Sequence, residues 1–171
     1  MTFAVSFFLS VVSRIIPHPA NFTAVGAFAI FNSRKMGVIK AVIFVLLVML
    51  VSDALIGFHY AQAFVYLGFV SYALWGFIAK SKLGILAAAV GGSLSFFVIS
   101  NIGVWLGPWY THDLAGLVRC FTLALPFYRN TLIGDVVCTV AIFSAYALYG
   151  KVKRGELVWL TSLQQPILKK K

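Results

Sequence analysis

Long apolar runs alternate with short polar segments along most of this 171-residue chain. A helix that crosses a membrane needs about 20 predominantly apolar residues. The pattern predicts six such spans, over about Phe3–Ile16, Phe22–Asn32, Val38–Ile56, Ala61–Ala79, Leu83–Leu106 and Asn130–Tyr149. The first two are short for a span, as is typical of tilted, broken or partly re-entrant helices.

The segment Gly107–Arg129, between the fifth and sixth runs, is too polar at its ends and too short in its apolar middle to span. We interpret Asp113–Leu125 as a short helix lying over the outer mouth of the bundle. The predicted fold is therefore an all-α, integral membrane six-helix bundle with an outer loop helix between spans five and six. Residues 1–150 form one transmembrane domain, and residues 151–171 form a basic cytoplasmic tail.

Composition supports an integral membrane protein, because 61% of the residues are hydrophobic and only 11% are charged. A soluble domain carries about 25% charged and about 45–50% apolar residues. The formal charge of +10 does not indicate nucleic-acid binding, because the basic residues lie in short clusters beside apolar runs. Cys120 and Cys138 lack metal-ligand spacing and are interpreted as small buried hydrophobic residues.

Lysine and arginine placement predicts the orientation, because cytoplasmic loops hold the excess of these residues. With both termini inside, only Arg14, Arg119 and Arg129 lie on the outer side. The inner side then holds eleven basic residues: Arg34, Lys35, Lys40, Lys80, Lys82, Lys151, Lys153, Arg154 and Lys169 to Lys171. This distribution predicts a multi-pass protein with both termini in the cytoplasm.

The segment Ile16–Thr23 is a polar elbow between two apolar runs, with His18 between Pro17 and Pro19. Each proline restricts its own backbone and the residue before it, which makes such a loop stiff. Irregular backbone at membrane depth is tolerated where it lines a cavity or is buried in protein. We therefore expect the elbow to form a cavity wall.

Most rare polar residues fall at the outer ends of the predicted spans, where such clustering favours a ligand pocket. The candidate ligand-binding residues are His18, Asn21, Thr23, Asp53, His59, Asn101, Trp105, Trp109, Tyr110, Arg129 and Asn130. The alternative is that the tryptophans and tyrosines form an interfacial belt while the charged groups cap helix ends.

The two intramembrane carboxylates need polar partners. For Asp53 we expect Arg129 or His59, and for Asp135 we expect Arg129, Asn101 or the region of Thr131. The three histidines lack the spacing of a metal site, so no metal is expected. The sequence contains no GxSxG, HExxH or phosphate-binding glycine loop, and we expect neither enzymatic activity nor a cofactor.

Several short motifs carry a resemblance that covers about residues 8 to 148. These are Arg14-x-x-Pro17-His18-Pro19-x-Asn21-Phe22-Thr23, Gly26-Ala27, Ser52-Asp53, Asn101-x-Gly103-Val104-Trp105 and Pro126-Phe127-x-Arg129-Asn130-Thr131-Leu132-x-Gly134-Asp135. The chain is similar to a family of uncharacterised small bacterial membrane proteins labelled as transporters. That family in turn resembles the substrate-binding components of energy-coupling-factor vitamin importers.

The resemblance implies a protein of the bacterial cytoplasmic membrane that takes a vitamin-like solute from outside and releases it inward. It also implies a transmembrane coupling subunit with ATPases as partner, and cobalamin is one candidate solute. Where those importers carry an Ala-x-x-x-Ala docking motif on their first helix, this chain has Ser6-x-x-x-Ser10. The alternatives are a structural or assembly membrane protein without a small-molecule ligand and, third, a membrane-embedded enzyme.

Overall fold

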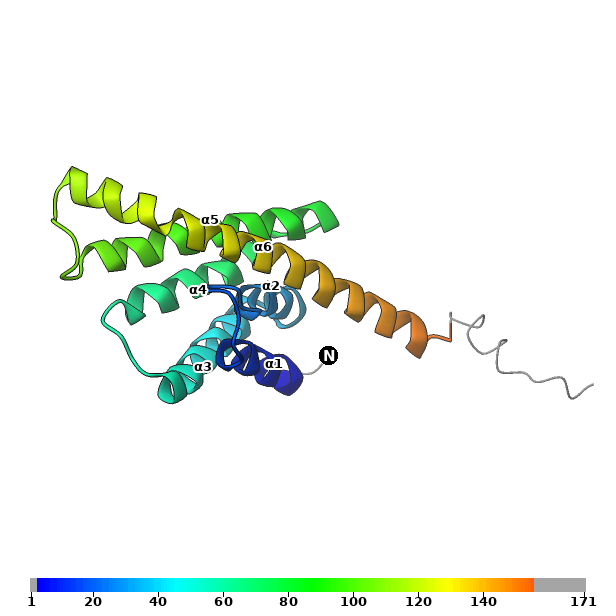
Figure 1. Cartoon of the computed structure of the whole chain (residues 1–171). Coiled ribbons are helices and arrows are strands. Elements are labelled where there is room, and N and C mark those ends of the chain that lie inside the picture. The colour runs from blue at the N-terminus through cyan, green and yellow to red at the C-terminus, as the bar shows by residue number, and fades with distance from the viewer. Residues whose placement is uncertain (1–2, 156–171) are drawn as a thin grey trace, which may run out of the picture.

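The computed structural model describes residues 3–155, which form six α-helices (Figure 1). Their bounds are α1 Phe3–Ile15, α2 Val25–Met36, α3 Val38–Ile56, α4 Gln62–Ile78, α5 Lys82–Trp105 and α6 Leu114–Lys153. The all-α prediction is confirmed. Three of these helices, α3, α5 and α6, are long and apolar enough to cross a membrane, in keeping with a membrane protein.

Helix α2 lies at the centre of the fold and contacts the other five helices. It buries nine consecutive residues, from Val25 to Ser33, around its whole circumference. With 12 residues it is about 18 Å long at 1.5 Å per residue. It begins three residues later than predicted, because Asn21 adopts a φ of 64° and the Phe22 N–H donates to the Pro19 carbonyl at 2.9 Å. The elbow therefore keeps Phe22 to Ala24 out of the helix.

Helix α6 corrects the prediction of a separate outer helix over Asp113–Leu125 followed by a span from Asn130. The structure has one continuous 40-residue helix with Pro126 inside it. Proline removes one backbone hydrogen bond and bends a helix, but here packing continues on both sides of it. The buried stripe on this helix consists of Gly116, Cys120, Ala124, Thr131, Gly134, Asp135 and Thr139. No separate helix covers the outer mouth within residues 3–155.

Helix α6 continues into the segment assigned to the tail. It ends at Lys153, so the first residues of that segment are helical. Residues 156–171, including the terminal Lys169 to Lys171, lie outside the described residues.

The connections between helices gather at two opposite ends of the molecule (Figure 1). The α1–α2, α3–α4 and α5–α6 loops lie together at what we call the loop end. The α2–α3 turn, the α4–α5 turn and the C-terminal end of α6 lie at the other end, which we call the basic end. The described basic residues in these latter segments are Arg34, Lys35, Lys40, Lys80, Lys82, Lys151, Lys153 and Arg154.

Asp113 caps the N-terminus of α6. One of its oxygens, Oδ1, accepts hydrogen bonds from the backbone N–H of Gly116 at 2.7 Å and from the Thr111 hydroxyl at 2.8 Å. These hydrogen bonds, the one from Gly116 first, stabilise the carboxylate and lower the pKa of Asp113. The pKa of Asp113 is therefore lower in the folded protein than in the unfolded chain. The cap contributes its full stabilisation of the folded state above the unfolded pKa, and this stabilisation is lost as the pH falls through the folded pKa.

We expect Asp113→Ala to fray the first turn of α6, because it removes the acceptor for the Gly116 N–H. Amide hydrogen exchange of residues 114–118 at pH 7 should be faster than in the wild type. Asp113→Asn is the matched control, since asparagine caps helices about as well as aspartate. Equal exchange in the alanine variant and the wild type would show that the cap contributes nothing.

Candidate functional site

A cavity of about 520 Å³ lies at the loop end of the molecule. It is bounded by α1, α3, α4, α5 and α6 and by all three loops at this end. Its lining residues are Arg14, His18, Asn21, Thr23, Ile56, His59, Val65, Phe69, Phe96, Phe97, Ser100, Asn101, Val104, Tyr110, Cys120, Leu123, Ala124, Phe127, Tyr128, Thr131 and Asp135. One wall is thus mainly aromatic, while the elbow and the α3–α4 loop contribute polar groups.

The structure brings six of the eleven predicted site residues together around this cavity. They are His18, Asn21, Thr23, His59, Asn101 and Tyr110. The other five, Asp53, Trp105, Trp109, Arg129 and Asn130, do not line it. That the six contact a ligand stays a prediction, taken up below.

The elbow holds its cavity-lining residues through local backbone geometry. Asn21 occupies the left-handed region, which asparagine tolerates better than most residues. The Asn130 side chain on α6 donates through Nδ2 to the Ala20 carbonyl at 3.2 Å. Asn130 therefore ties the elbow to α6 from outside the cavity.

Trp105 stabilises the α5–α6 connection. Its Nε1 donates to the Thr111 carbonyl at 3.0 Å, and its ring lies edge-on to His112 with centroids 5.8 Å apart. Nε2 of His112 lies 3.2 Å from the Gly107 carbonyl oxygen. Trp109, in the same connection, is 73% exposed, as expected of a side chain at a membrane interface.

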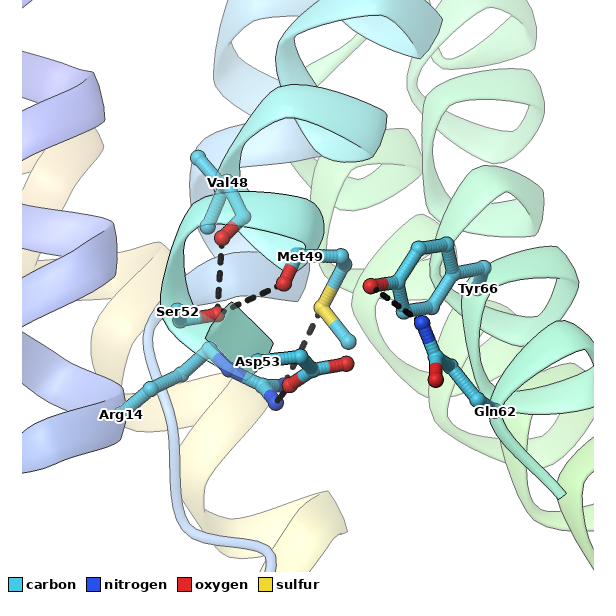
Figure 2. Close-up of polar contacts among 7 residues, drawn as sticks. All are labelled: Arg14, Val48, Met49, Ser52, Asp53, Gln62 and Tyr66. Atoms are coloured by element: carbon cyan, nitrogen blue, oxygen red, sulfur yellow. Dashed lines mark hydrogen bonds and ion pairs between the residues drawn. The ribbon is translucent and has the colours of Figure 1, made fainter. Parts of the chain in front are cut away.

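Asp53 forms an ion pair with Arg14, which corrects the expectation that Arg129 or His59 would be its partner (Figure 2). The last turns of α1 and α3 lie side by side, so the Arg14 guanidinium reaches the carboxylate directly. Its Nη2 donates to Asp53 Oδ1, and its Nη1 lies 3.1 Å from the Met49 sulfur. Asp53 is 1% exposed, whereas Arg129 lies on the exposed side of α6. The pair places a neutralised arginine at the cavity wall.

Asp135 is bound by hydroxyl groups, which corrects the expectation of Arg129, Asn101 or the Thr131 region. Its Oδ2 accepts hydrogen bonds from the Tyr72 hydroxyl and, at 2.5 Å, from the Ser93 hydroxyl. The Asn101 amide instead donates to the Phe97 carbonyl at 2.7 Å, and the Thr131 hydroxyl donates to the Phe127 carbonyl at 3.0 Å. The Asn101 amide and the Thr131 hydroxyl thus each donate to a carbonyl of their own helix instead of to Asp135.

Glycines let Tyr72 and Asp135 approach the neighbouring backbones. A Cβ added at Gly26 would lie 2.6 Å from Tyr72 Cε1 and 2.7 Å from Asp135 Oδ1. A Cβ added at Gly92 would lie 2.4 Å from Tyr72 Cδ1. Asp135 was recognisable from the sequence as a buried carboxylate, whereas Tyr72 and Ser93 carry no signal of their own within the apolar helices α4 and α5.

An aromatic-walled pocket was expected from the sequence, but the phenylalanines that form the wall were not among the candidate residues, although a periodic signal for them was present. Phe69 and Phe96 have ring centroids 4.6 Å apart, and Phe97 and Tyr128 have centroids 4.7 Å apart. Phe97 precedes Asn101 by four residues, so the two share one face of α5. A search for aromatic residues at this spacing from the polar candidates would have identified the wall.

The three histidines do not meet at one point. His18 and His59 line the cavity, whereas His112 belongs to the α5–α6 connection. Among residues 3–155, no three His, Cys, Asp or Glu side chains are grouped so that they could hold a metal ion.

Comparison with known proteins assigns the chain to a family. The sequence pattern of a family of unknown function, DUF6580, matches residues 1–157. The chain belongs to the DUF6580 family. No curated protein and no solved structure shows significant similarity to it. The DUF6580 match includes all the cavity-lining residues, and it agrees with the expected membership of an uncharacterised family.

Proposed function

We propose that this chain is a membrane solute-binding component that takes up a small vitamin-like molecule from the outer side and releases it inward. The observation that supports this most directly is the cavity of about 520 Å³ at the loop end. Small-molecule sites are concave, mostly apolar, and carry a few convergent polar groups. The aromatic wall and the polar side chains of His59, Asn101 and Asp135 match that description.

The size of the cavity favours a solute with one or two rings. Pockets for drug-sized ligands measure about 300–1,000 Å³ and enclose most of the ligand surface. A cavity in the lower half of that range suits a vitamin fragment or precursor better than the much larger cobalamin. We therefore propose a small ring compound as the solute.

Charge placement supports an orientation with the loop end outside. The eight described basic residues of the inner set belong to the basic end, and the cavity belongs to the opposite end. By the positive-inside tendency, the basic end faces the cytoplasm. We propose six membrane-embedded helices in the bacterial cytoplasmic membrane, with short α2 enclosed by the other helices and short α1 packed against α2 and α3 at the edge of the bundle.

Release of the solute would use a coupling partner, as the resemblance to vitamin importers implies. Ser6 and Ser10, the residues at the spacing of the importers' docking motif, are both fully buried within this chain. A transmembrane coupling subunit would therefore dock on a different face.

Native mass spectrometry of the detergent-purified protein tests the proposal by detecting a co-purified small molecule. We expect Asn101→Leu to reduce its occupancy about tenfold, because the substitution removes a polar group from the cavity wall. Arg129→Ala is the control, since Arg129 lies outside the cavity. An empty spectrum together with a stoichiometric protein partner would favour the assembly role instead.

A further inference from the structure

The deepest polar group of the cavity is a carboxylate. Asp135 lies near the middle of α6, is 3% exposed, and receives its two hydroxyl donors from the middles of α4 and α5. Both donors, from Tyr72 and Ser93, bind the same oxygen, Oδ2. The other oxygen, Oδ1, packs against Gly26, where an added Cβ would lie 2.7 Å from it, and it accepts no hydrogen bond from the described residues.

This carboxylate lacks a cationic partner among the described residues. Arg14 and Asp135 are the arginine and the carboxylic acid among the cavity-lining residues, and Arg14 is already paired with Asp53. The positively charged residues of the basic end lie at the far end of the molecule (Figure 1). A buried carboxylate without a counter-charge is unfavourable, and a cation entering the cavity would compensate it.

The aromatic wall favours the same type of ligand. Phe69 and Phe96 stand beside Tyr72, with ring centroids 5.9 Å and 6.4 Å from the Tyr72 ring. Ring faces attract cations, and they attract them more strongly where water is excluded. Flat rings also offer stacking surfaces to a planar ligand.

We propose that the solute is a planar aromatic compound with a cationic nitrogen, and that Asp135 binds this nitrogen through Oδ1. Tyr72 and Ser93 position the carboxylate, and the rings of Phe69, Phe96 and Phe97 contact the ring of the solute. This inference rests on the proposed solute-binding function and specifies the chemical class of its ligand.

Two probes that share one planar ring system test the assignment in the purified full-length protein. 4-Aminoquinoline is protonated at pH 7, whereas quinoline is neutral, and calorimetry measures the affinity of each. We expect the wild type to prefer 4-aminoquinoline by about tenfold, the range of a partly desolvated charge interaction. Asp135→Asn keeps an oxygen for Tyr72 and Ser93 but removes the charge, so the preference should fall to about twofold or less.

Asp113→Asn is the matched control, because it removes a carboxylate outside the cavity and should retain the tenfold preference. Equal wild-type affinities for the two probes, or a preference that survives Asp135→Asn, would overturn the cation site. Neither result would contradict the proposed solute-binding function. Binding of neither probe, with a co-purified solute that lacks a basic nitrogen, would overturn the ligand class alone. Binding of neither probe and an empty native spectrum would overturn the proposed function as well.

Discussion

Replacing Arg14 with methionine should destabilise the protein by about 3–5 kcal/mol, because it leaves the Asp53 carboxylate buried without its ion-pair partner. Asp53 is 1% exposed, and its Oδ2 has no hydrogen-bond partner among the described residues, so the guanidinium is the ion-pair partner that this buried carboxylate would lose. The Arg14 side chain also contacts the Met49 sulfur, and that contact is lost too (Figure 2). Thermal unfolding in detergent, followed by tryptophan fluorescence, measures the loss.

The double variant Arg14→Met/Asp53→Leu distinguishes the cost of leaving Asp53 unpaired from the cost of changed side-chain packing. Replacing a whole buried pair by apolar residues is often neutral or stabilising, so this variant should recover most of the lost stability. Arg34→Met is the control for removing a positive charge, because Arg34 is exposed and its replacement should change stability by less than about 0.5 kcal/mol. A single Arg14→Met variant as stable as the wild type would show that the pair does not hold α1 against α3.

Gly92→Ala should destabilise the protein by about 1–3 kcal/mol through overpacking. The added Cβ would lie 2.4 Å from the Tyr72 ring, which cannot easily move. Tyr72 is fully buried, its hydroxyl donates to Asp135, and Phe69 and Phe96 flank its ring. We also expect solute occupancy to fall in this variant, since any shift of Tyr72 moves the carboxylate at the bottom of the cavity.

Gly150→Ala provides the matched comparison on another helix. The Cβ added there would meet only the end of the Arg154 side chain, at 3.4 Å. Removing glycine from an open helical position should stabilise the protein by up to about 1 kcal/mol. A Gly92→Ala variant with a thermal midpoint equal to or above that of the wild type would contradict the close approach of α4 and α5 at Gly92.

The bounds of the middle helices followed from the sequence because they depend on the length of an apolar run. Helix α3 has the predicted range Val38–Ile56, and α4 and α5 differ from their predicted ranges by one residue at each end. The proline elbow was also predicted, since prolines restrict local backbone whatever the rest of the chain does.

Helix α6 was predicted incorrectly because its continuity depends on contacts between helices. A proline and polar flanking residues favour a break near Pro126 when the chain is considered alone. In the folded protein, buried residues on both sides of Pro126 share one stripe, so packing outweighs the single lost hydrogen bond. Local propensity is a weak prior where tertiary contacts continue across a breaker.

The partners of the two buried carboxylates could not be predicted for a related reason. Arg14 and Asp53 are 39 positions apart, and Asp135 is 42 positions from Ser93 and 63 from Tyr72. Several polar residues at the loop end could have donated hydrogen bonds to these carboxylates, and their residue types alone do not show which of them does.

The sequence by itself determined the helical class, most of the apolar segments, the uneven distribution of basic residues and the presence of polar groups near one end. These properties depend on composition along short stretches, because partition into an apolar environment is roughly additive over a run of residues. The tertiary structure alone decided which side chains enter the cavity, that Arg129 and Trp109 stay outside it, and that Asp135 lies at its bottom. Those outcomes depend on helix rotation and on glycine contacts, which require the positions of several helices at once.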